Sequence, residues 1–414
     1  MRKYNIWGFI VMMLLAASCD QARLNPDNNI KTLPLTRSEA SYVEANKDFA
    51  TELLHMYYDK EGAAKGFVLS PVSLQMFFGM LNAAASEDQA AQINKMLGYD
   101  GRTAEGINSF CRKVLESSPT LDSKVTVDVS NQWWLNSAAG FKFYASFANT
   151  LKENYQVDGE VRDFSTEPMY EITRTWVLNH THGMIDVGCP PPYPRQCIIA
   201  NTAYFKADWK DPFDQKQSFQ GDFRRENGST THVKYMNRLF RDLDLYQDNT
   251  MQALYLPLGD GAFQMEFYLP REGKQVRDVL SSLRAGQFPR KGEPGPAQVT
   301  LPSFDLLCSN GTLAGDLQNH FQVSLCDPDR SSNKYPLSGE DNEGVGIELG
   351  NVAHIARIIV NETGAEAAAV TINHAFTMNN EVRYFSATRP FVFVIREVGS
   401  GIVFFNGIFA GDTK

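Results

Sequence analysis

The sequence predicts an α+β fold in a single domain, residues 38–414. Three observations support this prediction. Helical spacing of apolar residues dominates the first half of the chain, strand-like apolar runs dominate the second half, and no repeat or low-complexity segment separates the two. With 414 residues, of which 43% are hydrophobic, the chain can bury a large core.

The first residues have the pattern of an export signal. Arg2 and Lys3 precede an apolar stretch, Ile6–Ala17, which is too short to span a membrane but has the length of a signal peptide. The stretch ends in LLAASC, and small residues before Cys19 resemble the lipobox of bacterial lipoproteins, although Ala16 stands where leucine is usual. We expect removal of residues 1–18, lipid on Cys19, a polar tether over 19–37, and attachment to the outer membrane of a bacterial cell envelope. A plain secretory signal is the alternative.

The charge and the cysteine spacing argue against binding to nucleic acid, to an anionic membrane surface and to zinc. The formal net charge of -9, with no lysine- and arginine-rich cluster, argues against binding to nucleic acid or to an anionic membrane surface. Five cysteines follow Cys19, and their spacing contains no zinc pattern such as C-x-x-C. An odd number leaves at least one thiol unpaired in a monomer, while Cys189 and Cys197 flank PPPYPRQ and are candidates for a small disulfide loop.

The predicted helices come first along the chain. Apolar side chains recur at helical spacing in the first, and Ser70-Pro71 begins the second, because proline is tolerated in a first turn. The helical segments with readable bounds are Ser38–Tyr58, Ala90–Leu97, Phe143–Tyr155 and Glu171–His180.

The predicted strands follow, with one alternating strand among the helices. ALYLPL and AFQMEFYLP, joined at Gly259-Asp260-Gly261, have the pattern of a hairpin. The last apolar pair, within Arg389–Ala410, turns at Gly399-Ser400-Gly401. The remaining predicted strands are Val125–Asn136, Cys197–Trp209, Val299–Cys308 and His354–Val360.

No catalytic motif is present in the sequence. It lacks a G-x-S-x-G elbow, an H-E-x-x-H helix and a Walker loop, and GVGIELG is one residue too long for a dinucleotide fingerprint. His180 and His182 stand beside Gly183 at a predicted helix end, where histidines commonly bond terminal carbonyls, so we favour a structural role over metal binding. We therefore predict no enzyme activity, no metal and no cofactor.

Asn361–Asn380 lies between two predicted strands and reads NETGAEAAAVTINHAFTMNN. Taken in alternation, one set of its residues is uncharged and small or modest in size: Ala365, Ala367, Ala369, Thr371, Asn373 and Ala375. The other set holds the charge and the larger groups: Glu366, Ala368, Val370, Ile372, His374 and Phe376. Because side chains alternate faces along a strand, this ribbon can enter a packed sheet by its small face without overpacking or burying a charge. An alanine-rich surface helix is the alternative.

Several separated motifs together resemble the serpin family and follow in the family's order. They are FVLSPVSL (Phe67–Leu74), NTAYFKADWKDPF (Asn201–Phe213), PLSG (Pro336–Gly339), NVAHIARIIVNETGAEAA (Asn351–Ala368) and RPFVFVI (Arg389–Ile395). The resemblance implies helices packed around a large mixed central sheet, two smaller sheets, and an exposed reactive-centre loop at about residues 362–388.

The resemblance also assigns roles to particular residues. It places the shutter, a buried polar cluster beneath the central sheet, at Ser70, Ser73, Asn201 and His354, and the breach at the top of that sheet at Trp209. It places the hinge at Glu362, Gly364, Ala365, Glu366, Ala367, Ala368 and Ala369. Ala365 replaces the threonine common in the family but remains small and uncharged, so we expect insertion to be unimpaired.

The bond that a protease would attack follows from hinge spacing in the family. Counting from Glu362 places it between Met378 and Asn379, whereas counting back from Pro390 places it between Asn379 and Asn380. Met378 suits elastase-like and subtilisin-like proteases, and Phe376 is an alternative for chymotrypsin-like enzymes. Arg383 stands late for attack by a trypsin-like enzyme.

The resemblance implies a suicide-type inhibitor of serine endopeptidases, with cysteine endopeptidases as a second target class, that traps the protease as an acyl-enzyme. We expect target proteases with an apolar primary pocket, a monomeric chain, and membrane attachment through the lipid anchor. A non-inhibitory serpin that acts as an envelope binding or carrier protein is the alternative, since fold does not determine function.

Overall fold

A computed structural model of the chain describes residues 30–412 with gaps. The gaps are residues 141, 143, 194–196, 285–288, 290–291, 293, 311–312, 325–333, 336–346, 349–352 and 365–380. Its α-helices are α1 Ala40–Glu61, α2 Pro71–Ala84, α3 Glu87–Leu97, α4 Ala104–Ser117, α5 Ala145–Tyr155, α6 Met169–His180, α7 Val276–Arg284 and α8 Leu313–Phe321.

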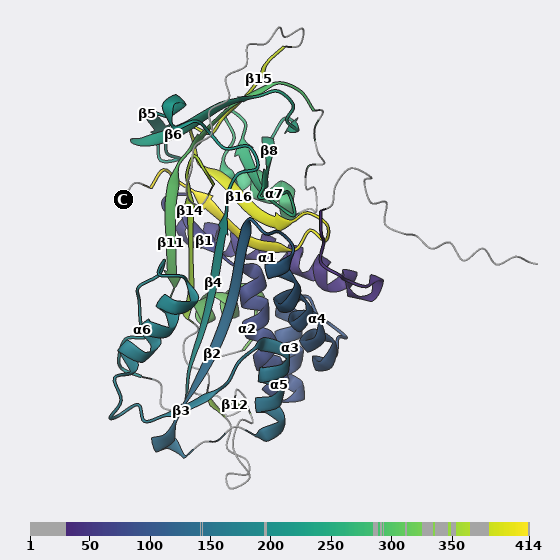
Figure 1. Cartoon of the computed structure of the whole chain (residues 1–414), viewed down its shortest axis with the longest axis vertical. Helices are drawn as coiled ribbons and strands as arrows, with labels where there is room; N and C mark the ends of the chain where they lie inside the picture. Colours follow the sequence, from purple (N-terminus) through teal and green to yellow (C-terminus); the bar gives the residue numbers. More distant parts are fainter. Residues whose placement is uncertain are drawn as a thin grey trace, which may run out of the picture.

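A mixed five-stranded sheet runs along the long axis of the molecule (Figure 1). Its order is β11-β14-β4-β2-β3, in which β14–β4 and β2–β3 are parallel and the other neighbours antiparallel. The strands are β2 Val125–Asn136, β3 Glu160–Arg162, β4 Cys197–Ala207, β11 Phe304–Asn310 and β14 Ala353–Val360.

Most of the remaining strands belong to two further sheets. A six-stranded antiparallel sheet has the order β1-β17-β16-β9-β8-β7. Its strands are β1 Phe67–Leu69, β7 Leu245–Gln247, β8 Met251–Leu258, β9 Phe263–Pro270, β16 Phe391–Glu397 and β17 Val403–Phe409. A four-stranded sheet, β15-β10-β6-β5, contains β5 Phe219–Arg224, β6 Thr230–Phe240, β10 Ala297–Pro302 and β15 Arg383–Ser386, and a small pair joins β12 Lys334–Tyr335 to β13 Ile347–Glu348.

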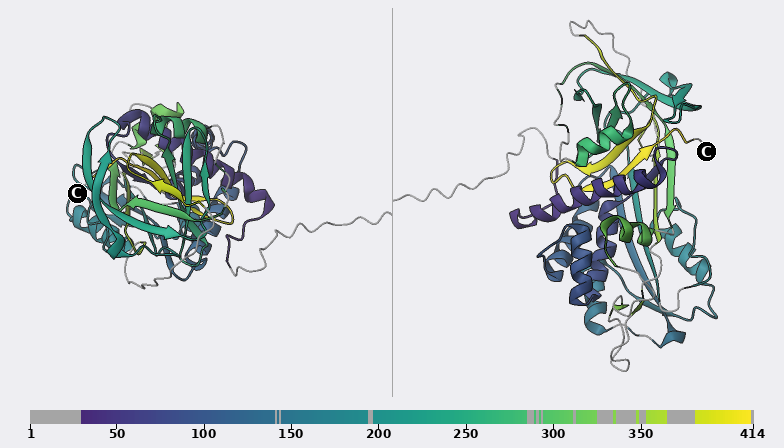
Figure 2. Two further views of the ribbon diagram at one scale, coloured as in Figure 1. Left: turned by 90° about the horizontal axis from the view of Figure 1, so that it is seen from above. Right: turned by 180° about the vertical axis from the view of Figure 1, so that it is seen from behind.

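The helices cover both faces of the five-stranded sheet. α2, α3, α4 and α5 lie on one side and α6 on the other (Figure 1), while α1 crosses between this helix group and the strands β16 and β17 (Figure 2). One large buried cluster joins α1, α2 and the three main sheets, and a second, small cluster lies between α6 and the five-stranded sheet. The predicted fold class, helices around a large mixed sheet with two other sheets, is confirmed.

Local signals explain several element ends. Pro71 occupies the first turn of α2, and the Ser70 side chain accepts a hydrogen bond from the backbone N–H of Ser73, at 3.3 Å. Gly98 ends α3 in the left-handed region, at φ +70°. None of the helices in the described part of the chain combines the length and the apolar composition that a membrane crossing requires.

One predicted strand is wrong in its extent. Val299–Cys308 was expected to be continuous, but the chain leaves the four-stranded sheet after Pro302 and enters the five-stranded sheet at Phe304. Ser303, between the two strands, donates its backbone N–H to the carbonyl of Lys234 in β6. A strand that changes sheets needs such a break, and the alternation of side chains does not reveal it.

Candidate functional site

The candidate site begins at the seam between β4 and β14, the two parallel strands at the centre of the five-stranded sheet. The ladder between them runs from Ala353–Ala200 to Ala356–Ala203 and stops there, although β14 continues to Val360 and β4 to Ala207. By contrast, β4 pairs with β2 along its whole length. The seam is therefore the most weakly paired part of this sheet among its long strands.

A tight turn, Asn361–Gly364, closes the upper end of the seam. Asn361 and Gly364 exchange backbone hydrogen bonds of 3.0 and 3.2 Å, and Gly364 also forms an antiparallel bridge with Asp208, just beyond β4. Gly364 has φ +120°, and a Cβ there would overlap the carbonyl of Ala207, so only glycine fits. Gly364 thus lies between the ends of both seam strands and is bridged to each side.

Trp209 holds this turn from the β4 side. Its backbone N–H donates to the carbonyl of Thr363 and its indole Nε1–H to the carbonyl of Asn361, both at 2.8 Å. Trp209 as a whole is 4% exposed. The predicted breach residue is therefore in direct contact with the turn that contains the predicted hinge residues Glu362 and Gly364.

Glu362 is the buried carboxylate of the turn. It is 3% exposed, and it accepts hydrogen bonds from Lys234 Nζ at 2.5 Å and Ser218 Oγ at 2.7 Å. Burial alone would raise the pKa of Glu362, but the hydrogen bonds from Lys234 and Ser218 outweigh it and hold the pKa below its ordinary value. The turn is thereby tied to β6 in the four-stranded sheet as well as to β4.

The four predicted shutter residues form one buried cluster beneath the seam. Asn201 and His354 are direct partners across the ladder, and all four residues are no more than 2% exposed. Ser73 Oγ donates to Asn201 Oδ1 at 2.5 Å, and the backbone N–H of Ser70 donates to His354 Nε2 at 3.1 Å. The cluster therefore joins α2 to both seam strands.

The hydrogen bonds determine the protonation of His354. Because Nε2 accepts from a backbone N–H, the ring proton lies on Nδ1, which faces Asn201 Oδ1 at 3.4 Å. Burial lowers the pKa of His354 to about 4. The shutter histidine is therefore neutral at pH 7.

Sequence reasoning missed Asn131, a further residue in contact with this buried cluster. Asn131 lies on β2 directly opposite Asn201, and its Oδ1 accepts from Asn201 Nδ2 at 2.7 Å. A polar residue within the apolar alternation of Val125–Asn136 was the available signal.

Arg383 is engaged by the body of the protein. Its guanidinium donates to the carbonyls of Leu243, at 2.9 Å, and Leu245, at 3.3 Å, at the start of β15. This arrangement anchors the point at which the chain re-enters the four-stranded sheet.

Other predicted residues lie outside the described part of the chain or have structural contacts. The predicted residues outside it are Cys19, Ala365, Glu366, Ala367, Ala368, Ala369, Phe376, Met378, Asn379 and Asn380.

His180 Nδ1 pairs with the carbonyl of Trp176 at 2.8 Å, as a helix-end histidine does. Cys189 and Cys197 are free thiols, and the described residues contain no group of three side chains suited to a metal ion.

Known proteins resemble the chain over most of its length. Residues 44–410 match the family described as Serpin (serine protease inhibitor). Serpin-ZXA of Oryza sativa subsp. japonica is 26% identical over 364 residues, which cover 84% of this chain and 90% of that protein. Serpin B8 of Bos taurus is 27% identical over 384 residues, which cover 89% and 98%.

Solved structures show the same fold. The thermophilic serpin Tengpin in its native state has a TM-score of 0.78 at 20% identity, covering 92% of this chain and 96% of that one. Arabidopsis AtSerpin1 in its native stressed conformation has a TM-score of 0.75 at 20% identity, covering 91% and 99%. Thyroxine-binding globulin in complex with thyroxine has a TM-score of 0.76 at 21% identity, covering 91% and 100%. Because the match to the serpin family description extends over residues 44–410, most of its length, the chain belongs to the serpin family.

Proposed function

We propose that this serpin inhibits serine endopeptidases, and cysteine endopeptidases of similar preference, by inserting its cleaved reactive loop between β4 and β14. The observation that carries the proposal is the position of Gly364. It is bridged to Asn361 at the end of β14 and to Asp208 at the end of β4. A chain continuing downward from Gly364 would run antiparallel to both strands and would fill the seam as a sixth strand.

The two bridges of Gly364 define the register of such a strand. Extended residue by residue, Ala369 would stand opposite both Ala203 and Ala356, and Thr371 opposite both Asn201 and His354. The existing ladder pairs Ala356 with Ala203 and His354 with Asn201. The bridges and the ladder therefore require the same register, so the insertion would need no slip of either strand.

This register places the small face of the loop on the buried side. Ala203, Phe205 and Ala207 of β4 are each no more than 5% exposed, as are Ala356, Ile358 and Val360 of β14. Ala365, Ala367 and Ala369 would fit between these pairs, where larger side chains would overpack. Glu366 would face outward, opposite Lys206, and would not be buried.

The mechanism then follows from the chemistry of acyl transfer. The nucleophile of the protease attacks the carbonyl of Met378, the amine of Asn379 leaves, and Met378 remains bound as the acyl-enzyme. Insertion breaks the Asn201–His354 contact, draws the acyl-enzyme along the sheet and distorts the catalytic geometry of the protease. The native state is held by its unfolding barrier rather than by its free energy.

The proposed target proteases and the proposed membrane attachment are based on the sequence alone. Met378 favours proteases with an apolar primary pocket, and Phe376 or a bond at Asn380 are the alternatives. Lipid on Cys19 would hold the monomeric inhibitor at the bacterial cell envelope.

The test uses the chain without residues 1–19, mixed with elastase-, subtilisin-, chymotrypsin- and papain-like proteases. The expected result is an adduct that survives a denaturing gel and a C-terminal peptide that begins at Asn379. A different peptide start would move the bait bond. Cleavage with neither an adduct nor a gain in heat stability would contradict inhibition.

Two matched variants test the register. Ala369→Arg would place a charge on the buried face and should give cleavage without an adduct. Ala368→Arg, one residue away, would place the same charge on the outward face and should still form the adduct. Equal behaviour of the two variants would contradict the proposed register.

The alternative is a binding or carrier protein on the same scaffold. The similar fold of thyroxine-binding globulin, solved with thyroxine, favours keeping this alternative. It predicts cleavage of the loop with no trapped protease.

A further inference from the structure

We propose that Arg357 acts as a clasp that keeps the β4–β14 seam closed by joining β14 to α6 and the chain that follows it, and that loss of the clasp speeds opening of the seam. We call α6 together with residues 183–189 the α6 unit. The inference concerns regulation of loop insertion and so rests on the proposed function.

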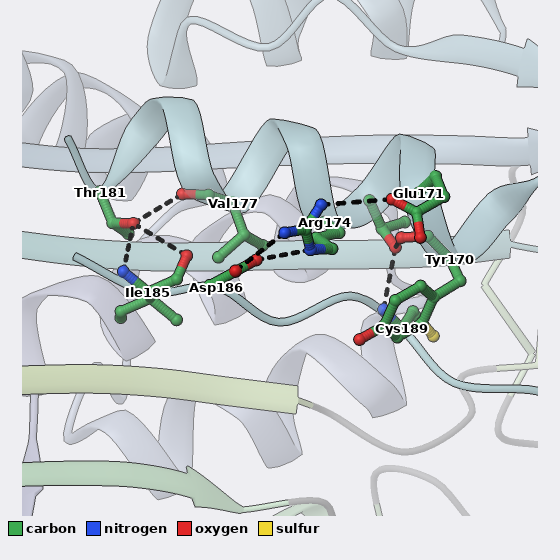
Figure 3. Close-up of polar contacts among 9 residues, drawn as sticks. Tyr170, Glu171, Arg174, Val177, Thr181, Ile185, Asp186 and Cys189 are labelled. Carbon is green, nitrogen blue, oxygen red and sulfur yellow. Dashed lines mark hydrogen bonds and ion pairs between the residues drawn. The ribbon is translucent and has the colours of Figure 1, made fainter. Parts of the chain in front are cut away.

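The α6 unit is tied together as one body. Arg174 Nη2 donates to Asp186 Oδ2 at 2.8 Å, and the backbone N–H of Ile185 donates to Thr181 Oγ1 at 3.1 Å (Figure 3). Further along, the backbone N–H of Cys189 donates to the buried Thr173 Oγ1 at 2.8 Å. Met184 lies between the anchored residues, so it moves with the helix.

The α6 unit packs on the β2 and β4 side of the seam. Trp134 of β2 and Ile198 of β4 form a separate buried cluster with Met169 of α6. Trp134 also meets Trp176 of α6 edge to face, with ring centroids 5.8 Å apart. The ring of His182 also packs against the ring of Tyr204 in β4, with ring centroids 4.5 Å apart.

Arg357 connects this unit to the other side of the seam. From β14, its Nη1 donates to the carbonyl of Met184. Its Nε and Nη2 donate to Asp305 Oδ1 and Oδ2 of β11, at 2.9 and 2.7 Å. The side chain is 22% exposed, and the two-point ion pair occupies Nε and Nη2, so that the bond to Met184 is made by the remaining nitrogen, Nη1.

Only one of these two contacts crosses the seam. β11 pairs with β14 from Phe304–Val360 to Asn310–His354, so Asp305 moves with Arg357. A new strand would move β4 and β14 further apart by about 4.8 Å, which is more than a hydrogen bond can stretch. The bond to Met184 must therefore break when the seam opens, unless the α6 unit leaves the sheet, while the ion pair with Asp305 survives.

The test compares wild type, Arg357→Ala and Asp305→Ala. Asp305→Ala removes the ion pair within the β11–β14 side but leaves the donor to Met184. Opening is followed in two ways: uptake of a synthetic peptide with the sequence of residues 365–376, seen by native gel, and hydrogen exchange of the backbone amides of β4 and β14. Neither measurement needs a protease.

We expect Arg357→Ala to take up the peptide about tenfold faster than wild type, as loss of one charge-assisted hydrogen bond implies. Asp305→Ala should stay within about threefold of wild type. If Arg357→Ala matches wild type in amide exchange at the seam, or if Asp305→Ala is as fast as Arg357→Ala, the clasp is wrong. If no variant takes up peptide, strand insertion fails as a function, and amide exchange alone decides the clasp.

Discussion

The neutral, buried His354 makes the stability of the shutter depend on pH. The pKa of His354 is lowered by burial to about 4 in the folded protein, against an ordinary value of 6.5. Between these two values the unfolded chain binds a proton that the folded protein does not, so stability falls as the pH drops below 6.5 and levels off below 4. Protonation would also remove the Nε2 lone pair that accepts from the backbone of Ser70.

The size of the effect follows from the two pKa values. Lowering the pH from 7.5 to 5 should cost the folded state about 2 kcal/mol from this one group. The assay is the midpoint of the first urea unfolding transition, followed by tryptophan fluorescence across this range. His354→Gln serves as the control, because glutamine can accept and donate similar hydrogen bonds but does not titrate.

Wild type should lose about 2 kcal/mol more than His354→Gln between pH 7.5 and 5. Parallel pH dependences for the two proteins would refute the reasoning. They would mean that His354 gains its proton as easily in the folded protein as in the unfolded chain.

Three further predictions concern the ends of the loop. Gly364→Val should lower the free energy of unfolding by about 2 kcal/mol or more, because residue 364 has a φ of +120° and an added side chain would overlap the carbonyl of Ala207. Gly273→Ala is the control and should lower it less, because residue 273, at φ +78°, faces open space. Equal urea midpoints for the two variants would contradict this prediction. Lys234→Met should lower stability by about 1–2 kcal/mol at pH 7.5, because it leaves the carboxylate of Glu362 without the ammonium group of Lys234. The loss should become smaller as the pH falls below the ordinary carboxyl pKa. The pKa of Glu362 is lowered in the folded protein, so the ion pair stabilises the protein above the ordinary pKa and this stabilisation is lost as the pH falls through the lowered pKa. Lys152→Met, from the exposed Lys152–Asp158 pair, is the control and should change the midpoint little. Arg383→Met should raise the ratio of cleaved chain to adduct about threefold, as counted from gel bands, by loosening the start of β15; an unchanged ratio would argue against anchoring.

Local patterns predicted much of the fold. The strand Val125–Asn136 has the bounds expected from its alternation, and Ser70-Pro71 starts a helix as expected. Family motifs identified both Trp209 and the segment Asn361–Gly364, which are far apart in the sequence and hydrogen-bonded to each other in the structure. Each of these signals is contained within a short stretch of residues.

One helix, α4, was not predicted although its sequence contains the signal, since Ile107, Phe110 and Val114 repeat at helical spacing.

Other features depend on partners that no short stretch contains. Asn131 contacts the shutter through Asn201, 70 positions away, and Arg357 meets Met184, 173 positions away. Nothing in the neighbourhood of either residue identifies its partner, so only the folded sheet reveals the contact.

The strand order of the six-stranded sheet determines what becomes of a cut molecule. Everything after the proposed bond at Met378 belongs to a fragment that supplies β15, β16 and β17, and β16 and β17 lie between β9 and β1 inside that sheet. The fragment is therefore held by neighbours on both sides and cannot diffuse away without unfolding the sheet. A spent inhibitor should elute from a sizing column as one particle, and both of its pieces should stay wherever its N-terminus is attached.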